Sequence, residues 1–76
     1  MKELVEKIAR ALVDDPDSVI VEEAQGSHTC VMKLKVSKDD VGKIIGKKGT
    51  NANAIRTILD AAGGKENRRY VLEILE

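Results

Sequence analysis

The chain has 76 residues, the size of one small domain, and at this length only about 60% of the surface of the unfolded chain can be buried. Its composition, 42% hydrophobic and 34% charged, supports a core and argues against a disordered chain. No apolar run approaches the roughly 18 residues that a membrane span needs, and a single cysteine excludes an internal disulfide framework. We therefore expect one globular domain over residues 1–76, in the reducing cytoplasm and without a membrane partner.

The charges are unevenly distributed along the chain, although the formal net charge is zero. Residues 1–32 carry a net charge of −4, residues 33–69 carry +6 and residues 70–76 carry −2. A basic middle segment is what a polyanion site requires, but the same asymmetry also occurs on ordinary solvated surfaces. A neutral total charge therefore does not exclude nucleic acid as a partner.

The N-terminal segment predicts a helix. Apolar residues recur at three-to-four-residue spacing with Lys and Glu between them, which predicts a helix over residues 2–14. Pro16 is expected to end it. We interpret the surrounding "DDPD" as a helix terminator rather than a divalent-ion site, because no further acids or histidines converge on it in the sequence.

The next segment predicts a β-hairpin. Residues 18–24 are β-branched and short, and "QGSH" then supplies turn chemistry. The following residues alternate, with Cys30, Met32, Leu34 and Val36 on one face, which predicts a half-buried second strand. Because the linker has about four residues, we expect the two strands to pair antiparallel.

The second half of the chain predicts two helices and a third strand. "SKDD" at residues 37–40 matches the Ser-x-x-Asp capping box before a short helix that Gly46 ends. The next helix is expected to start at Thr50 or Asn51 and to end at Gly63 and Gly64, and the closing "RRYVLEILE" alternates as a strand. The order α-β-β-α-α-β predicts a two-layer α+β domain in which three helices cover one face of a three-stranded sheet.

The stretch "VGKIIGKKGT" at residues 41–50 places two lysines between two glycines, directly after two isoleucines. Glycine removes the Cβ atoms that would keep another chain away from the backbone. The loop also leads into a helix whose first N–H groups and positive dipole end favour an anion. The spacing matches neither a Walker A motif nor GxGxxG, which leaves a loop that holds a phosphate chain or an ordinary basic turn.

The segment "VGKIIGKKGTNANAIRTIL" resembles the helix, GxxG loop and helix of KH domains, and the element order is similar to that of the bacterial type II variant. With "LVEKIARALVDDPDSV" at the front, the whole chain resembles the KhpA family of small bacterial single-KH proteins. The resemblance implies binding of single-stranded RNA, or of single-stranded DNA, and a role as a small RNA chaperone or post-transcriptional regulator. It also implies a homodimer, or a heterodimer with a larger KH-containing RNA-binding protein.

The same resemblance implies nine residues at the RNA site. They are Gly46, Lys47, Lys48, Gly49, Lys43, Ile45, Thr50, Ala52 and Arg56. The GKKG quartet would clamp the backbone of about four unpaired nucleotides. Ile44 or Ile45, with Ala52 and Ile55, would line an apolar wall, but the periodicity of the isoleucines favours the core as their first role.

Other positions are expected to add to this site or to modify it. Leu34 or Val36 and the polar edge of the second strand would meet the bases. Lys43 and Arg56 would contact phosphates, or would be ordinary solvated residues. The family pattern has Arg at position 50 and more apolar or basic residues at positions 51 and 53, so Thr50, Asn51 and Asn53 are expected to lower phosphate affinity.

The remaining candidates point away from catalysis. His28 falls in the hairpin turn and Cys30 faces the core, so they cannot act as a nucleophile pair, and a zinc site lacks ligands. We therefore expect no enzyme activity, cofactor or metal. Arg68 and Arg69 suit the protection of a strand edge. Tyr70, the only aromatic residue, suits packing, and without aromatic side chains to read bases we expect low sequence specificity. The alternative function is a protein-docking KH-fold module, a dimerisation or adaptor subunit with little RNA affinity of its own.

Overall fold

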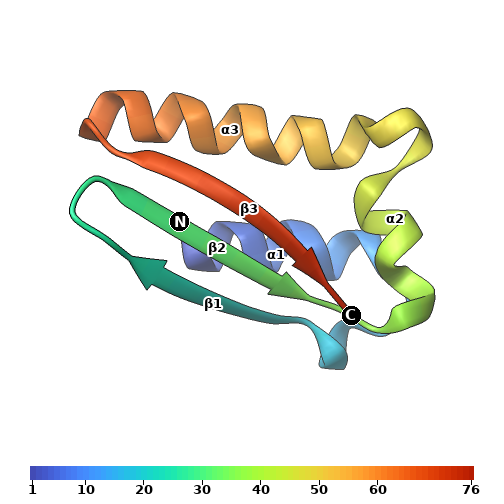
Figure 1. Ribbon diagram of the computed structural model, residues 1–76. Coiled ribbons are helices and arrows are strands. Elements are labelled where there is room, and N and C mark those ends of the chain that lie inside the picture. The colour runs from blue at the N-terminus through green and yellow to red at the C-terminus, as the bar shows by residue number, and fades with distance from the viewer.

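The computed structural model describes residues 1–76 and has the expected element order (Figure 1). Short 3₁₀ helices at residues 16–18, 38–40 and 47–49 connect the main elements. The main elements are α1 (Lys2–Leu12), β1 (Ile20–Gln25), β2 (Thr29–Lys35), α2 (Val41–Ile45), α3 (Thr50–Glu66) and β3 (Arg69–Leu75). The predicted α+β class and the α-β-β-α-α-β order are confirmed.

The three strands form one mixed sheet in the order β1-β2-β3. β1 and β2 pair antiparallel, with Ile20 opposite Lys35, which confirms the predicted hairpin. β2 and β3 pair parallel, with Thr29 opposite Arg69, because α2 and α3 carry the chain back to the starting end of β2. The central strand β2 is therefore paired on both sides, and one edge of β3 is left unpaired.

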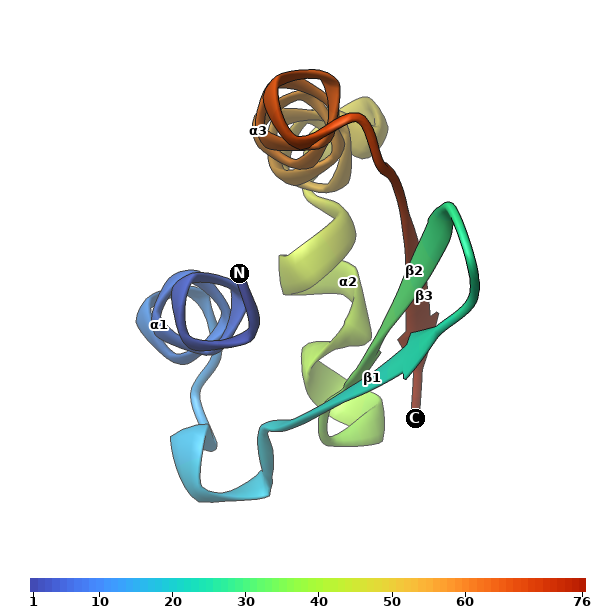
Figure 2. The same cartoon turned by 90° about the vertical axis from the view of Figure 1, so that its left-hand side faces the viewer.

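All three helices lie on one face of the sheet, as predicted (Figure 2). Alternation along β2 places Cys30, Met32 and Leu34 completely inside, against Ile44 of α2 and Leu59 of α3. Burial of each large apolar side chain stabilises the fold by about 1.5–3 kcal/mol. The helical face of the sheet is thus the core, and its other face is open.

This burial contradicts one expectation about the bases. Leu34 and Val36 are 0% and 3% exposed and point toward the helices, so no ligand reaches their side chains. The edges of β2 are taken by β1 and β3. The prediction that Leu34 or Val36 and the edge of the second strand meet the bases is therefore wrong, and any strand edge open to a ligand on the α3 side belongs to β3.

The capping box predicted at Ser37 is also wrong, because no side-chain hydrogen bond caps the turn that begins there. Asp40 is instead buried, and its carboxylate accepts hydrogen bonds from the backbone N–H groups of Asp14 (3.2 Å) and Asp15 (3.1 Å). These donors follow the end of α1 and would otherwise lack partners. The carboxylate therefore connects the segment after α1 to the start of α2. Helix α1 ends at Leu12, two residues earlier than predicted.

The predicted end of α3 at Gly63 and Gly64 is wrong by about one turn. The helix continues to Glu66, and Asn67 ends it in the left-handed conformation, at φ 55° and ψ 43°. The backbone N–H of Arg68 then donates to the carbonyl of Gly63 (2.7 Å). A Cβ atom at Gly63 would overlap the carbonyl oxygen of Arg68, so this glycine serves a close approach between α3 and β3.

Candidate nucleic-acid interface

The GKKG loop, residues 46–49, joins α2 to α3 and has an unusual backbone. Three of its residues have positive φ: Gly46 (77°), Lys48 (57°) and Gly49 (78°). With ψ at 174°, Gly46 occupies a region that is essentially restricted to glycine. The turn closes with a hydrogen bond from the N–H of Gly49 to the carbonyl of Gly46 (3.2 Å). The turn itself therefore requires glycine at position 46 and favours it at position 49, whatever binds there.

The lysines of this loop are free to meet a ligand. Lys47 and Lys48 are exposed, and neither forms an ion pair. They lie beside the first turn of α3, where the positive end of the helix dipole favours an anion. Thr50 is exposed there too, and its hydroxyl donates to the carbonyl of Lys47. The loop therefore gathers positive potential around two exposed lysines.

Asn51 holds the loop in this shape, a role that sequence reasoning missed. Its side-chain N–H donates to the carbonyl of Lys43 (2.9 Å), in the last turn of α2. Its Cβ and Cγ atoms occupy the space next to Gly46, so that a Cβ on Gly46 would lie 2.7–2.9 Å from them. Asn51 lies in the first turn of α3 and therefore links α3 to α2 across the loop.

Lys43 is committed to the protein itself. Its ammonium lies 3.0 Å from the carboxylate of Asp14 and 3.6 Å from that of Asp40. The hydrogen bond with Asp14 is the main cause that raises the pKa of Lys43. Because acids already neutralise Lys43, it has less charge to offer a phosphate than Lys47 or Lys48.

The buried carboxylate of Asp40 makes the stability of the fold depend on pH. Burial by itself raises the pKa of Asp40, but the N–H donors of Asp14 and Asp15 and the Lys43 ammonium outweigh it, so the pKa lies below its ordinary value. A lowered pKa in the folded state means that the stabilisation is complete above the unfolded pKa of about 3.9 and is lost as the pH falls through the folded value.

We therefore expect Asp40→Asn to lower the midpoint of urea unfolding at pH 7, and the difference from the parent to shrink below about pH 4. The asparagine amide presents an N–H to one backbone donor and cannot pair with Lys43. Urea titrations of both proteins between pH 2.5 and pH 7 measure this. Asp39→Asn, at an exposed neighbouring carboxylate, is the control and should not change the pH profile. An Asp40→Asn deficit that is the same at every pH would refute the account.

The other predicted site residues separate into exposed and buried groups. Ile45, 39% exposed, and the exposed Arg56 are available to a ligand. Ile44, Ala52 and Ile55 are 0–3% exposed and belong to the core, so they support the loop from below and do not line a wall. The expected apolar wall is therefore reduced to the side chain of Ile45.

A groove between α3 and β3 was missed by the sequence analysis. It has a volume of about 230 Å³ and lies next to the unpaired edge of β3. It is lined by Arg56, Asp60, Arg69, Tyr70, Val71 and Leu72. No sequence signal could have joined these residues without knowing that β3 is an edge strand beside α3.

Tyr70 and Cys30 have the structural roles that were expected of them. Tyr70 is 8% exposed and its hydroxyl donates to Glu66 (3.2 Å), while burial is the main cause that raises its pKa. Cys30 is a free thiol with no exposed surface, and burial raises its pKa, which disfavours a thiolate nucleophile. None of the helices combines the length and the apolar character that crossing a membrane requires.

Comparison with known proteins agrees with this geometry. Residues 2–74 match the family model described as "KhpA/KhpB, KH domain". The chain is 52% identical over 75 residues to the "RNA-binding protein KhpA" of Clostridium acetobutylicum and 53% identical over 75 residues to that of Clostridium perfringens, with 99% of this chain and 100% of each relative covered. It is 50% identical to the protein of the same name from Aquifex aeolicus, over 100% of this chain and 96% of the relative. No solved structure matches the chain significantly. The GxxG loop, the fold and these relatives together show that the chain belongs to the KhpA/KhpB family of KH domains, a family of binding proteins rather than enzymes.

Proposed function

We propose that this chain, as a single KH domain over residues 1–76, binds single-stranded RNA through the GKKG loop and the adjoining groove. The observation that carries the proposal is the loop itself. Asn51 fills the space beside Gly46, but Gly49 leaves the backbone without a Cβ atom, and Lys47 and Lys48 extend from the loop exposed and unpaired at the N-terminal end of α3. The relatives named RNA-binding proteins over the full length of the chain support the same function.

The arrangement of the elements gives the bound strand a path. Phosphates of about four nucleotides would lie on the GKKG loop, with Thr50 beside them. Arg56 lies six residues further along α3. The bases would then face the groove, where Val71 is half-buried and the free edge of β3 offers backbone donors and acceptors. Hydrogen bonding to an edge in this way does not need aromatic side chains.

The expected selectivity of this site is low, which suits an RNA chaperone or a post-transcriptional regulator in the cytoplasm. Tyr70 is the only aromatic residue, and its ring is buried, so it cannot stack on bases. Backbone clamping reads phosphates, which all sequences share. Single-stranded DNA is expected to bind through the same contacts.

A site for about four nucleotides binds weakly, so useful affinity requires more than one site. We propose that the chain acts as a homodimer or with a larger KH-containing RNA-binding protein. Ile45 (39% exposed) and Ile58 (42% exposed) leave apolar surface uncovered on α2 and α3. The same surface favours the second candidate function, a docking module with little RNA affinity.

The salt dependence of RNA affinity separates the two candidates. For two to four phosphate contacts we expect the slope of log K against log salt concentration to be about −1.4 to −2.8. Fluorescence anisotropy of a short labelled RNA between 25 and 300 mM KCl measures it. Affinity that does not change with salt, or no binding at 25 mM, would favour the docking module.

A further inference from the structure

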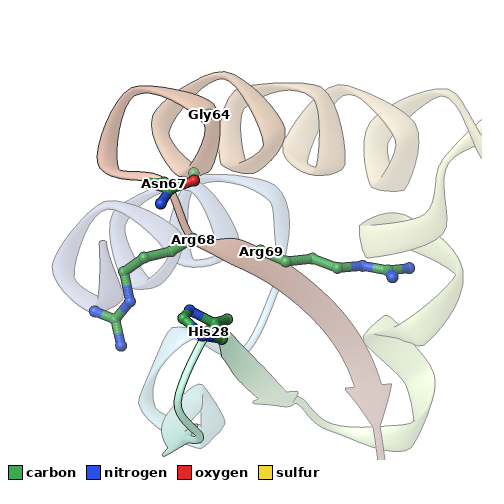
Figure 3. Close-up of a pocket in the computed structure, with 6 residues that line it drawn as sticks. His28, Gly64, Asn67, Arg68 and Arg69 are labelled. Atoms are coloured by element: carbon green, nitrogen blue, oxygen red, sulfur yellow. The ribbon is translucent and has the colours of Figure 1, made fainter.

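A second basic surface lies at the C-terminal end of α3, at the far end of this helix from the GKKG loop (Figure 3). It is an open depression of about 460 Å³ without any hydrophobic lining residue. Its lining residues are His28, Gly63, Gly64, Asn67, Arg68 and Arg69. None of the functions described above uses this depression.

The cations of the depression are not neutralised by the protein. Neither Arg68 nor Arg69 forms an ion pair, and the guanidinium of Arg68 donates to the neutral side chain of Gln25 (3.1 Å). The C-terminal end of α3 contributes roughly half a negative charge, which the guanidinium of Arg68 alone exceeds. The carbonyl of Gly63 is also occupied, because it accepts the N–H of Arg68. The depression therefore suits an anionic ligand.

Arg69 connects this depression to the proposed RNA groove, because it lines both. Figure 3 shows its side chain extending from the start of β3 in the direction of α2, while Arg68 points the other way. A strand leaving the GKKG loop would pass Arg56 and then meet Arg69 and Arg68. Asp60 is the one acid that lines the groove on this route. The 17 residues of α3 span about 25 Å, so the far end lies beyond a short clamped segment.

The depression also offers what the rest of the proposed site lacks, which is a ring open to a base. Tyr70 is buried, whereas the His28 ring in the hairpin turn is exposed. Figure 3 shows this ring below the two arginines. Unpaired bases stack on histidine rings and on the planes of arginine guanidinium groups in RNA-binding proteins.

We propose that this depression binds the nucleotides that continue beyond the clamped four, with one phosphate held by Arg69 on the groove side, the next held by Arg68, and a base placed against His28. The inference rests on the proposed RNA binding by the loop, since the strand enters from there. It extends the site from one end of α3 to the other and assigns a ligand to the hairpin turn.

Binding of oligouridines of four and eight nucleotides tests this proposal. The affinities are measured for the parent chain and for the double variant His28→Gln/Arg68→Gln, which changes two residues that line the depression but not the groove. The parent should bind the octamer about 30-fold more tightly than the tetramer, a few-fold from extra registers and about tenfold from added contacts. The double variant should bind the tetramer like the parent and should keep only the few-fold register gain. Its salt slope for the octamer should be shallower by about 0.7, the contribution of the one phosphate contact that Arg68 makes.

Two further variants control for charge and folding. Lys65→Gln removes one exposed charge from the last turn of α3 outside the depression and should keep the full octamer gain. Arg68→Lys keeps the positive charge and should retain most of the gain in affinity from tetramer to octamer. An octamer gain unchanged in the double variant would overturn the inference while leaving the loop proposal intact, and would leave an acidic partner peptide as the candidate ligand. If the parent does not bind the tetramer, or if replacement of Lys47 and Lys48 by aspartate leaves tetramer affinity unchanged, both the inference and the loop proposal are overturned.

Discussion

Replacement of Lys47 and Lys48 together by aspartate is expected to weaken RNA binding by about 100-fold near 0.1 M salt, about tenfold for each lysine. Both side chains are exposed and unpaired, so the substitution removes two phosphate contacts and places negative charge beside the helix N-terminus. The fold should persist, because neither side chain packs in the core. Anisotropy titrations with a short RNA, with circular dichroism melts in parallel, measure both effects.

The matched control changes the same number of charges elsewhere. Lys2→Asp/Lys7→Asp alters two exposed, unpaired lysines of α1 and gives the same net charge. Its RNA affinity should fall much less than that of the loop variant, since only the overall charge of the protein differs. Equal losses for the two double variants would mean that the loop contributes only general electrostatic attraction.

Gly63→Ala is expected to have the largest effect on stability, about 3 kcal/mol, because the new methyl group would overlap a backbone atom. The obstructing atom is the carbonyl oxygen of Arg68, with the Tyr70 ring 3.1 Å away on the same side. Backbone cannot rotate aside as a flexible side chain can, so α3 and β3 must separate. The midpoint of thermal unfolding should fall by more than about 10 °C.

Gly64→Ala is the control for this substitution. Gly64 is the next residue in the same helix, and a Cβ there would meet nothing within 4 Å. Alanine in an exposed helical position stabilises by about 0.5–1 kcal/mol relative to glycine. The two variants should therefore shift the thermal midpoint in opposite directions. If both raised it, the close approach of α3 to β3 would be absent in solution.

The parts of the fold that could be predicted from the sequence are those set by local periodicity. The alternation from Cys30 to Val36 identified β2 and its buried face, because a strand shows its pattern within a few residues. Gly46 ended α2 as expected, since its positive φ is a local property. The GxxG loop was also found from the sequence, because its four residues are consecutive.

The parts that were missed depend on contacts between distant residues. Asp40 resembled part of a helix cap, but its partners are backbone groups 25 and 26 residues away. Gly63 resembled a helix stop, but it allows β3 to pass close to α3. The candidate groove exists because β3 pairs parallel with β2 and so leaves its other edge free beside α3. The alternation of residues along a strand does not reveal which strand it pairs with.

Amide chemical-shift changes during titration with a four-nucleotide RNA would show whether the GKKG loop binds the strand. We expect the largest changes in the GKKG loop and the first turn of α3, residues 46–53, followed by the free edge of β3 at residues 69–72, with α1 and β1 unaffected. Changes confined to other surfaces, with the resonances of Gly46 and Gly49 unmoved at saturating RNA, would contradict it.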